Sequence, residues 1–267
     1  MSKSVFLSFA IMLFPFLCNA QENNIVNQEL SDSPNQEQQI SSSVVSNDFR
    51  NNDLEDLLAN ATVETIETLK NEGFDFNSKD NAGNPPLYYL LARNQDLEVA
   101  KKAIEYGADV NTPARNGMLP LNIATSKANE LQLQIMMMKT MGLDTNNPEV
   151  QEELKKKLFH EMTRAIEMAK LLIENGANVN LTSTLGTPLM NAVTNIWNLD
   201  IVKIIIDAGA DLDIKDNNGK TALFYAQASG NSEVVKLLIE HGANTEIKDV
   251  SGKVYTDMEM VNVDPAI

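Results

Sequence analysis

The sequence contains almost no cysteine and very little histidine. Its one cysteine is Cys18, and it lies in an N-terminal segment that we expect to be removed. A mature chain without cysteine has no disulfide, no thiolate nucleophile and no cysteine-based metal site. His160 and His241 are the two histidines, and neither has the second histidine that a zinc-protease helix needs. We therefore predict no metal site and no cofactor.

Enzyme signatures are also missing. The sequence has no GxxxxGK phosphate loop, no GxSxG nucleophile turn and no GxGxxG dinucleotide turn. Carboxylates are plentiful, but neighbours such as Glu152 and Glu153 point apart on a helix, which is typical of a solvated face. We predict a protein with no catalytic residues. A carboxylate-dependent enzyme is the alternative from another functional class.

Basic residues are scarce relative to acidic ones. The chain has 21 Lys and Arg against 37 Asp and Glu, and its formal net charge is -16. Binding to phosphate depends on clustered basic side chains that release counterions. We therefore predict no nucleic-acid partner, and no attraction to an anionic membrane surface.

The apolar run near the N-terminus is too short for an ordinary membrane span. It extends from Val5 to Leu17 and contains Pro15, whereas a span needs about 20 apolar residues. Lys3 precedes the run and small residues follow it, so we predict a secretory signal over residues 1–20, cleaved after Ala20. A membrane anchor and an acylated Cys18 are the alternatives. We expect an exported protein, periplasmic or secreted, with no membrane contact after cleavage. The absence of disulfides favours a bacterial periplasm.

Residues 21–47 have the composition of a linker. They are rich in Gln, Asn, Ser and Glu and contain no aromatic residue. Such a segment cannot bury enough apolar surface to offset its ordering entropy. We predict a disordered polar linker over 21–47 and a folded domain over 48–267.

The folded part contains a repeated phrase. LLIENGANVN at 171–180 has near-copies that begin at residues 102, 204 and 237. Gly176, Gly209 and Gly242 are 33 residues apart, and a first interval, from Gly73 to Gly107, is 34. A second glycine series, each member six residues after an Asn, Asp or Glu, comprises Gly83, Gly117, Gly186, Gly219 and Gly252. A period near 33 predicts a fold of stacked repeats.

Each unit has a physical interpretation. The apolar triplet belongs to a helix whose buried stripe includes Leu172, Ile205 and Leu238, and we predict that these three share one continuous dry seam. The glycine after the triplet ends the helix in a left-handed conformation. Stretches such as DNNG at 216–219 predict tight hairpin tips. Thr187 and Thr221 are expected to cap the helices that follow.

The unit resembles the ankyrin repeat, most clearly at 219–244, GKTALFYAQASGNSEVVKLLIEHGAN. The resemblance covers about 48–260 and implies an all-α solenoid of stacked helix-turn-helix units with β-hairpin-like loops. It divides the domain into a cap at 48–79, repeats at 80–113, 114–181, 182–215 and 216–248, and a C-terminal cap at 249–267. The family's usual TPLH becomes PPLY, LPLN, TPLM and TALF. Since no repeat keeps that histidine, we predict modest stability.

One repeat is interrupted by an insertion. Gly117 and Gly186 are 69 residues apart, about twice the period. The excess predicts one extended helical hairpin at about 127–165, which projects from the stack on the side opposite the hairpin tips. Its second helix should begin with Asn147 as the cap and Pro148 in the first turn.

The resemblance implies a non-catalytic protein–protein interaction module that binds a protein partner of unknown identity and is a monomer when free. The expected binding surface is a concave groove formed by hairpin tips and first helices, and possibly the Met-rich hairpin. Candidate contacts at the tips are Asn81, Arg115, Asn116, Asn217 and Asn218. Candidates near the first helices are Tyr88, Tyr89, Phe224 and Tyr225. Candidates in the hairpin are Met136, Met137, Met138 and Met141, which could instead pack the hairpin itself.

Two further readings stay open within the non-enzymatic class. The charge of -16 would suit an acidic inhibitor or immunity-like protein that masks a basic toxin or enzyme, through electrostatic steering. A structural spacer in a cell-envelope complex is the other reading.

Overall fold

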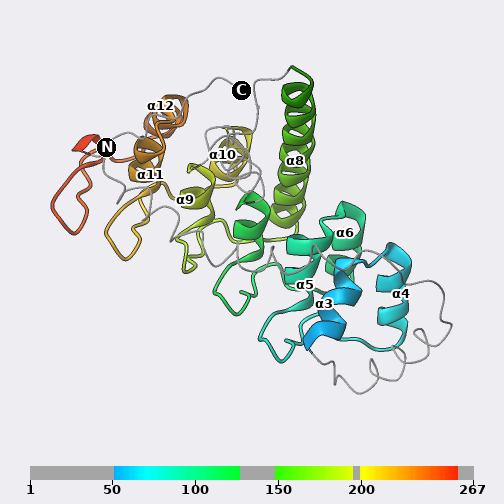
Figure 1. Cartoon of the computed structure of the whole chain (residues 1–267). Helices are drawn as coiled ribbons and strands as arrows, with labels where there is room; N and C mark the ends of the chain where they lie inside the picture. The colour runs from blue at the N-terminus through cyan, green and yellow to red at the C-terminus, as the bar shows by residue number, and fades with distance from the viewer. Residues whose placement is uncertain (1–50, 127–147, 195–198, 258–267) are drawn as a thin grey trace. The chain divides into compact units, whose positions relative to one another are not determined.

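A computed structural model describes residues 51–126, 148–194 and 199–257 (Figure 1). All of them belong to one unit of the chain, residues 42–267. The predicted signal, the predicted linker and the first arm of the predicted hairpin lie outside the described residues. Those predictions stay predictions.

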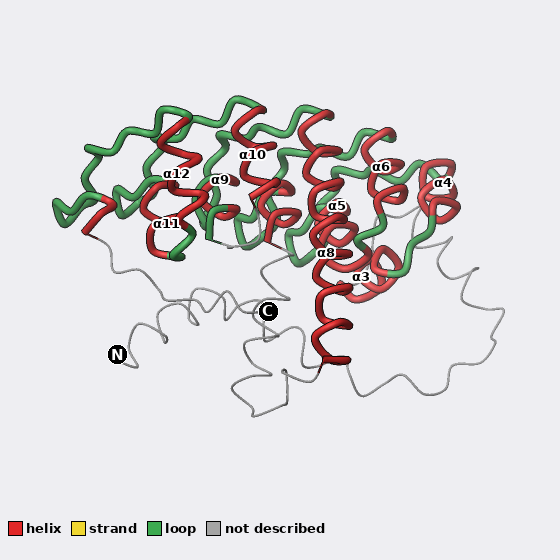
Figure 2. The backbone as a smooth tube through the Cα atoms, turned by 90° about the horizontal axis from the view of Figure 1, so that it is seen from above, coloured by secondary structure: helices red, strands yellow, loops and turns green. Residues whose placement is uncertain are grey.

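The described part is built from pairs of helices joined by loops. First helices of the pairs contact one another, as α3 does with α5 and α9 with α11. Second helices do the same in the order α4, α6, α8, α10 and α12 (Figure 2). No strand occurs among the described residues, where an isolated bridge joins Ser183 to Gly186. The predicted all-α stack of helix pairs is confirmed.

The pairs have the following bounds. The N-terminal cap contains α3 (Asn51–Ala59) and α4 (Val63–Asn71), and the next repeat contains α5 (Pro86–Tyr89), the π-helix η1 (Leu90–Asn94) and α6 (Leu97–Glu105). Residues 120–126 are helical, and α8 (Pro148–Glu174) belongs to the same repeat. The last pairs are α9 (Pro188–Ala192) with α10 (Leu199–Asp207) and α11 (Ala222–Ala228) with α12 (Ser232–Glu240). A short 3-10 helix, η2 (Tyr255–Asp257), follows them.

The predicted seam is present. Leu172, Ile205 and Leu238 are each 0% exposed, on α8, α10 and α12 respectively. Removing such side chains from water contributes about 1.5–3 kcal/mol each. The 33-residue spacing therefore places equivalent apolar residues side by side in one continuous core.

Glycine ends the second helices as predicted. Gly209 has φ +87°, and its amide donates to the Ile206 carbonyl at 2.9 Å. The next amide, of Ala210, donates back to the Ile205 carbonyl at 3.2 Å. This pair of bonds satisfies the last carbonyls of α10, and it requires a left-handed residue that costs little for glycine.

The predicted caps divide into one confirmed and one corrected. Thr187 begins α9, and its hydroxyl accepts from the Met190 amide at 3.2 Å. Thr221 begins α11 without a side-chain cap; its backbone carbonyl accepts from the Phe224 amide at 3.1 Å. The capping role of the Thr221 hydroxyl was therefore wrong, although the helix begins where we predicted.

The N-terminal cap closes its end with aromatic rings. Phe74 and Phe76 occupy the places that Ala108 and Val110 take in the next repeat, and they are 4% and 2% exposed. Their ring centroids lie 5.1 Å apart, edge to face. A terminal repeat has no earlier neighbour to cover these positions, so larger side chains fill the space.

The 34-residue interval has a structural counterpart in η1. The first helix of this repeat holds one residue more than that of the last repeat, and it absorbs the extra residue as a π-turn, in which the Gln95 amide donates to the Leu90 carbonyl at 2.7 Å. Gln95 has φ +61° and occupies the place where the last repeat has Gly230 at φ +75°.

The end of η1 is fastened on two sides. The Arg93 guanidinium lies 2.8 Å from a Glu55 carboxylate oxygen on α3. The Asn94 amide group donates to the Ala61 carbonyl at 2.7 Å. On the other side, the Arg164 guanidinium of α8 donates to the Gln95 carbonyl at 2.7 Å. These bonds join the N-terminal cap and the insertion to the repeat between them.

Helix α8 is the second arm of the predicted hairpin. It has 27 residues and begins at Pro148, as predicted. Its C-terminal half packs between α6 and α10 and buries Ala165, Ala169 and Leu172. None of the described side chains from 150 to 164 is buried. Figure 1 shows this half of α8 rising beyond its neighbours, away from the hairpin loops.

Candidate functional site

The hairpin loops present a row of exposed residue pairs. Each pair stands immediately before a glycine of the second series, and we call the five pairs the tip row: 81–82, 115–116, 184–185, 217–218 and 250–251. In the loop from Asp216 to Lys220 the Asp216 amide donates to the Lys220 carbonyl at 2.9 Å, and the Gly219 amide donates to the Asp216 carbonyl at 3.0 Å. Paired bonds of this kind are those of a β-hairpin turn, as predicted.

An aspartate braces this loop from inside. Asp216 Oδ1 accepts from the backbone amides of Asn218 and Lys220, at 2.9 and 2.8 Å. Asp216 Oδ2 accepts from the Tyr225 hydroxyl at 2.5 Å. Burial acts to raise the pKa of the Asp216 carboxyl, but these bonds outweigh it and hold the pKa below its usual value. The carboxylate therefore fixes the tip to helix α11.

The first complete repeat uses the same brace. The Tyr89 hydroxyl donates to Asp80 Oδ2 at 2.5 Å, and the Asn84 amide donates to Asp80 Oδ1 at 2.8 Å. Burial, followed by the hydrogen bond to the aspartate, raises the pKa of the Tyr89 hydroxyl well above its usual value, and the same causes raise that of Tyr225. Both hydroxyls therefore keep their protons and remain donors at neutral pH.

Neighbouring tips are tied to each other. The Arg115 amide donates to Asn84 Oδ1 at 3.0 Å. The Thr184 hydroxyl donates to the Asn116 carbonyl at 2.8 Å. The Val250 amide donates to the Asn218 carbonyl at 2.9 Å. Bonds between repeats therefore fix the spacing along the row.

A second set of bonds joins the repeats below the tips, and we call it the asparagine ladder. It is formed by Asn77, Asn111 and Asn180, each six residues before a tip glycine. The Asn180 side chain donates to the Gly209 carbonyl at 3.2 Å and accepts from the Asp211 amide at 2.8 Å. Asn77 and Asn111 make the same two bonds to the repeat that follows each of them. Each asparagine thus holds the end of the next repeat's second helix.

The predicted tip residues lie where the sequence placed them. Asn81, Arg115, Asn116, Asn217 and Asn218 are all exposed, and all belong to the tip row. Their backbones are held by the bonds described above, while their side chains face solvent. Whether a partner contacts them stays a prediction.

The predicted aromatic contacts fall into two groups. Tyr88 and Tyr225 are half-buried beside the tips. Tyr89 is 3% exposed and Phe224 is 1% exposed, so both are core residues in this structure. Their side chains were expected in the groove, but Tyr89 turns inward to bond Asp80 and Phe224 fills the space between repeats. Neither presents a surface to a partner.

The sequence analysis missed four tip-row residues. Leu185 and Val250 are apolar and 39% and 76% exposed, and Thr184 and Ser251 are exposed beside them. The signal that could have found them is their offset, since each stands one or two residues before Gly186 or Gly252. The methionine candidates Met136, Met137, Met138 and Met141 lie outside the described residues.

The tip row is nearly free of charge. Its residues are Asn81, Ala82, Arg115, Asn116, Thr184, Leu185, Asn217, Asn218, Val250 and Ser251, so Arg115 is its one charged member. Acidic residues instead occupy exposed positions of the second helices, such as Glu67, Glu105, Glu167 and Glu240. The acidity of the chain is therefore not a property of this row.

Two other kinds of site were sought within the described ranges. No group of three or more His, Cys, Asp or Glu side chains there could hold a metal ion. None of the helices described in the structure is long and apolar enough to cross a membrane.

Comparison with known proteins supports the repeat assignment. Residues 159–249 match the family model described as ankyrin repeats (3 copies). No curated protein matches the chain. The matched range begins within α8 and includes both of the last helix pairs, where the phrase is most regular; the repeat that contains η1 lies before it. Repeats of this type generally mediate protein–protein interaction. The structure is therefore an all-α ankyrin-repeat solenoid, and residues 159–249 are its recognisable ankyrin repeats.

Proposed function

We propose that this protein is a non-catalytic binding module that holds a protein partner against its tip row. The observation that carries the proposal is the row itself: exposed side chains stand on loops whose backbones are bonded to each other and to the stack. A surface that is already ordered loses little conformational entropy on binding. Loops held on a rigid scaffold are the usual place for recognition residues.

The row favours a partner surface that is largely uncharged. Amide side chains at 81, 116, 217 and 218 can donate and accept hydrogen bonds. Leu185 and Val250 supply apolar area on either side of the 217–218 tip, and half-buried Tyr88 and Tyr225 can contribute aromatic area beside the tips. An acidic inhibitor that masks a basic toxin receives no support from this row, because its one charged residue is basic.

Site-specific photo-crosslinking in the native host tests the proposal. A photoreactive residue replaces Asn217 or Val250 in the tip row in two variants, and Lys236 or Asp207, exposed on second helices, in two controls. We expect one and the same protein to be captured from both tip positions and from neither control. Capture from the controls alone, or equally from all four positions, would contradict the proposal.

A second measurement uses the captured partner in purified form. Leu185→Asp and Val250→Asp place charge on the apolar part of the row without touching the core, and we expect each to weaken binding about tenfold or more. Lys236→Asp, a larger change of charge on a second helix, should leave the affinity within about twofold, as is usual outside an interface. Equal effects of all three would assign binding to another surface.

A further inference from the structure

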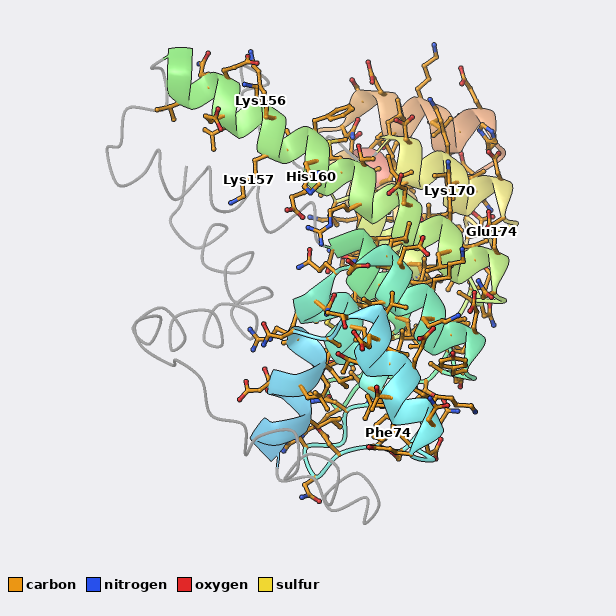
Figure 3. The ribbon with its side chains drawn as sticks, turned by 90° about the vertical axis from the view of Figure 1, so that its right-hand side faces the viewer. Phe74, Lys156, Lys157, His160, Lys170 and Glu174 are labelled. Atoms are coloured by element: carbon orange, nitrogen blue, oxygen red, sulfur yellow. The ribbon has the colours of Figure 1, made fainter. Side chains whose placement is uncertain are left out.

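Helix α8 carries an exposed face that nothing in the described stack covers. At intervals of three or four residues, the outward stripe consists of Glu152, Lys156, Phe159, Thr163, Glu167 and Lys170. Thr163 is half-buried and the other five are exposed. The buried residues Ala165, Ala169 and Leu172 lie on the opposite side of the helix. Figure 3 shows Lys156, His160, Lys170 and Glu174 along the length of α8.

Phe159 stands in the middle of this stripe. Its side chain is 74% exposed, and among the large hydrophobic residues of the described part only Val250 is as exposed. A single exposed apolar residue is common on protein surfaces and requires no partner. Its position between two pairs of opposite charges is the feature that calls for an explanation.

The charges of the stripe follow a self-complementary order. From the N-terminal end they are negative (Glu152), positive (Lys156), none (Phe159 and Thr163), negative (Glu167) and positive (Lys170). Read backwards, each negative position becomes positive and each positive position negative. A second copy of α8 that lies antiparallel on the first therefore meets opposite charges along its whole length.

The register of that pairing is defined by the sequence. Glu152 lies opposite Lys170 of the second copy, Lys156 lies beside its Glu167, and Phe159 rests on its Thr163. Twofold symmetry makes every contact twice, which is the usual form of a homodimer. Antiparallel helices also place the negative end of one macrodipole beside the positive end of the other.

The charges concerned are little used within one copy. Glu167 and Lys170 form no ion pair with the rest of the described residues. Lys156 Nζ lies 3.9 Å from Glu152 and 3.7 Å from Glu153, with all three side chains more than 60% exposed. Exposed pairs of this kind contribute little. Their exchange for pairs across an interface therefore costs little.

We propose that the outward stripe of α8 is a self-association surface, on which a second copy of this chain docks through its own α8 in antiparallel orientation. The proposal replaces the expectation of a monomer and is independent of the tip row. The net charge of -16 on each copy opposes association at long range. At 0.15 M salt, charges separated by more than about 8 Å are largely screened, so short-range pairs decide the outcome.

Sedimentation equilibrium of the full chain at 0.15 M salt measures the association. We expect a monomer–dimer equilibrium with a dissociation constant of about 10–100 µM, as befits a small polar interface. Lys156→Glu and Glu167→Lys each place like charges together twice, and each should weaken the dimer about tenfold or more. The double variant, Lys156→Glu with Glu167→Lys, restores opposite charges and should regain the affinity of the natural chain.

Two further variants sharpen the result. Lys236→Glu makes the same charge change on α12, where Lys236 is also exposed and paired with Glu240 at 3.6 Å, and it should leave the dimer unchanged. Phe159→Ser should weaken it. Circular dichroism checks that every variant keeps its helix content. A natural chain that stays monomeric up to about 1 mM would overturn the proposal. So would a dimer that ignores the single reversals, or one that the double reversal fails to restore.

Discussion

The asparagine ladder makes a prediction whose sign can be tested at two equivalent positions. The ladder position of the last complete interval is occupied by Asp213 in place of asparagine. Asp213 Oδ1 accepts from the Asn244 amide at 2.9 Å, as an asparagine would. A carboxylate has no N–H to donate, so the bond that Asn180 makes to Gly209 has no counterpart between Asp213 and the Gly242 carbonyl. Asp213→Asn should supply it.

The expected gain follows from one added hydrogen bond. Such a bond contributes about 0.5–1.5 kcal/mol to stability. For a domain of about 200 residues, 1 kcal/mol shifts Tm by about 2–4 °C, so Asp213→Asn should raise Tm by about 1–6 °C. The reverse change, Asn180→Asp, removes the donor to the Gly209 carbonyl at 3.2 Å and should lower Tm by a similar amount. Thermal unfolding followed by circular dichroism measures both.

The control separates the hydrogen bond from the change in net charge. Asp207→Asn removes one negative charge from an exposed position of α10, away from the ladder, and should shift Tm by less than about 1 °C, as surface changes usually do. If Asp213→Asn stabilises no more than Asp207→Asn does, the gain is electrostatic and the reasoning about the ladder is wrong. An unchanged Tm for Asn180→Asp would refute it independently.

Three other predictions concern the tips and η1. Tyr225→Phe removes the hydroxyl that bonds Asp216, so NMR titration should show the pKa of Asp216 rising, and unfolding by urea should show a loss of about 1 kcal/mol. The pKa values of Asp216 and Asp249 are lowered in the fold; this contribution to stability is present above about pH 4 and is lost as the pH falls through the folded pKa values, so urea midpoints should fall between pH 5 and pH 3. Gln95→Gly should be tolerated because φ is +61° there, whereas Gln95→Val should cost at least about 1 kcal/mol, and equal urea midpoints for the two variants would show that the left-handed conformation is not maintained.

The core could be predicted from the sequence because its signal is periodic. Leu172, Ile205 and Leu238 recur at intervals of 33 residues, and all three are completely buried. The glycines that end the second helices were identified for the same reason, since a left-handed residue is required at the same place in every repeat. Spacing alone carries this kind of information, because each repeat places its residues in the same surroundings.

The ladder was visible in the sequence but its purpose was not. The analysis noted that an Asn, Asp or Glu precedes each tip glycine by six residues. The partners of Asn180 are backbone groups of residues 209 and 211, and backbone groups leave no trace in a sequence. The same limit applies to Phe224, whose place in the first helix is regular but whose ring is buried by the neighbouring repeat.

The missing family histidine has different consequences in different repeats. Tyrosine and aspartate brace the tip in two of them, through Tyr89 with Asp80 and Tyr225 with Asp216. Asn122 occupies the histidine's position in the third repeat, where it is 0% exposed and both polar atoms of its side chain lack a hydrogen-bond partner. An unsatisfied buried amide costs about 1–3 kcal/mol. This local deficit adjoins the insertion and supports the prediction of modest stability.

The single extra residue of the second repeat shows how such a stack tolerates departure from its period. An insertion in a helix would ordinarily rotate every later residue by about 100° and turn the buried stripe away from the core. The π-turn of η1 confines that rotation, because Asp96 still begins α6 as Asn231 begins α12. The widened turn also brings Arg93 to Glu55 and the Gln95 carbonyl to Arg164. These contacts lie at the two places where the regular repeat is interrupted, the N-terminal cap and the insertion. The irregular interval of 34 residues therefore coincides with bonds that a regular first helix would not place there, which accounts for its presence next to both irregular ends.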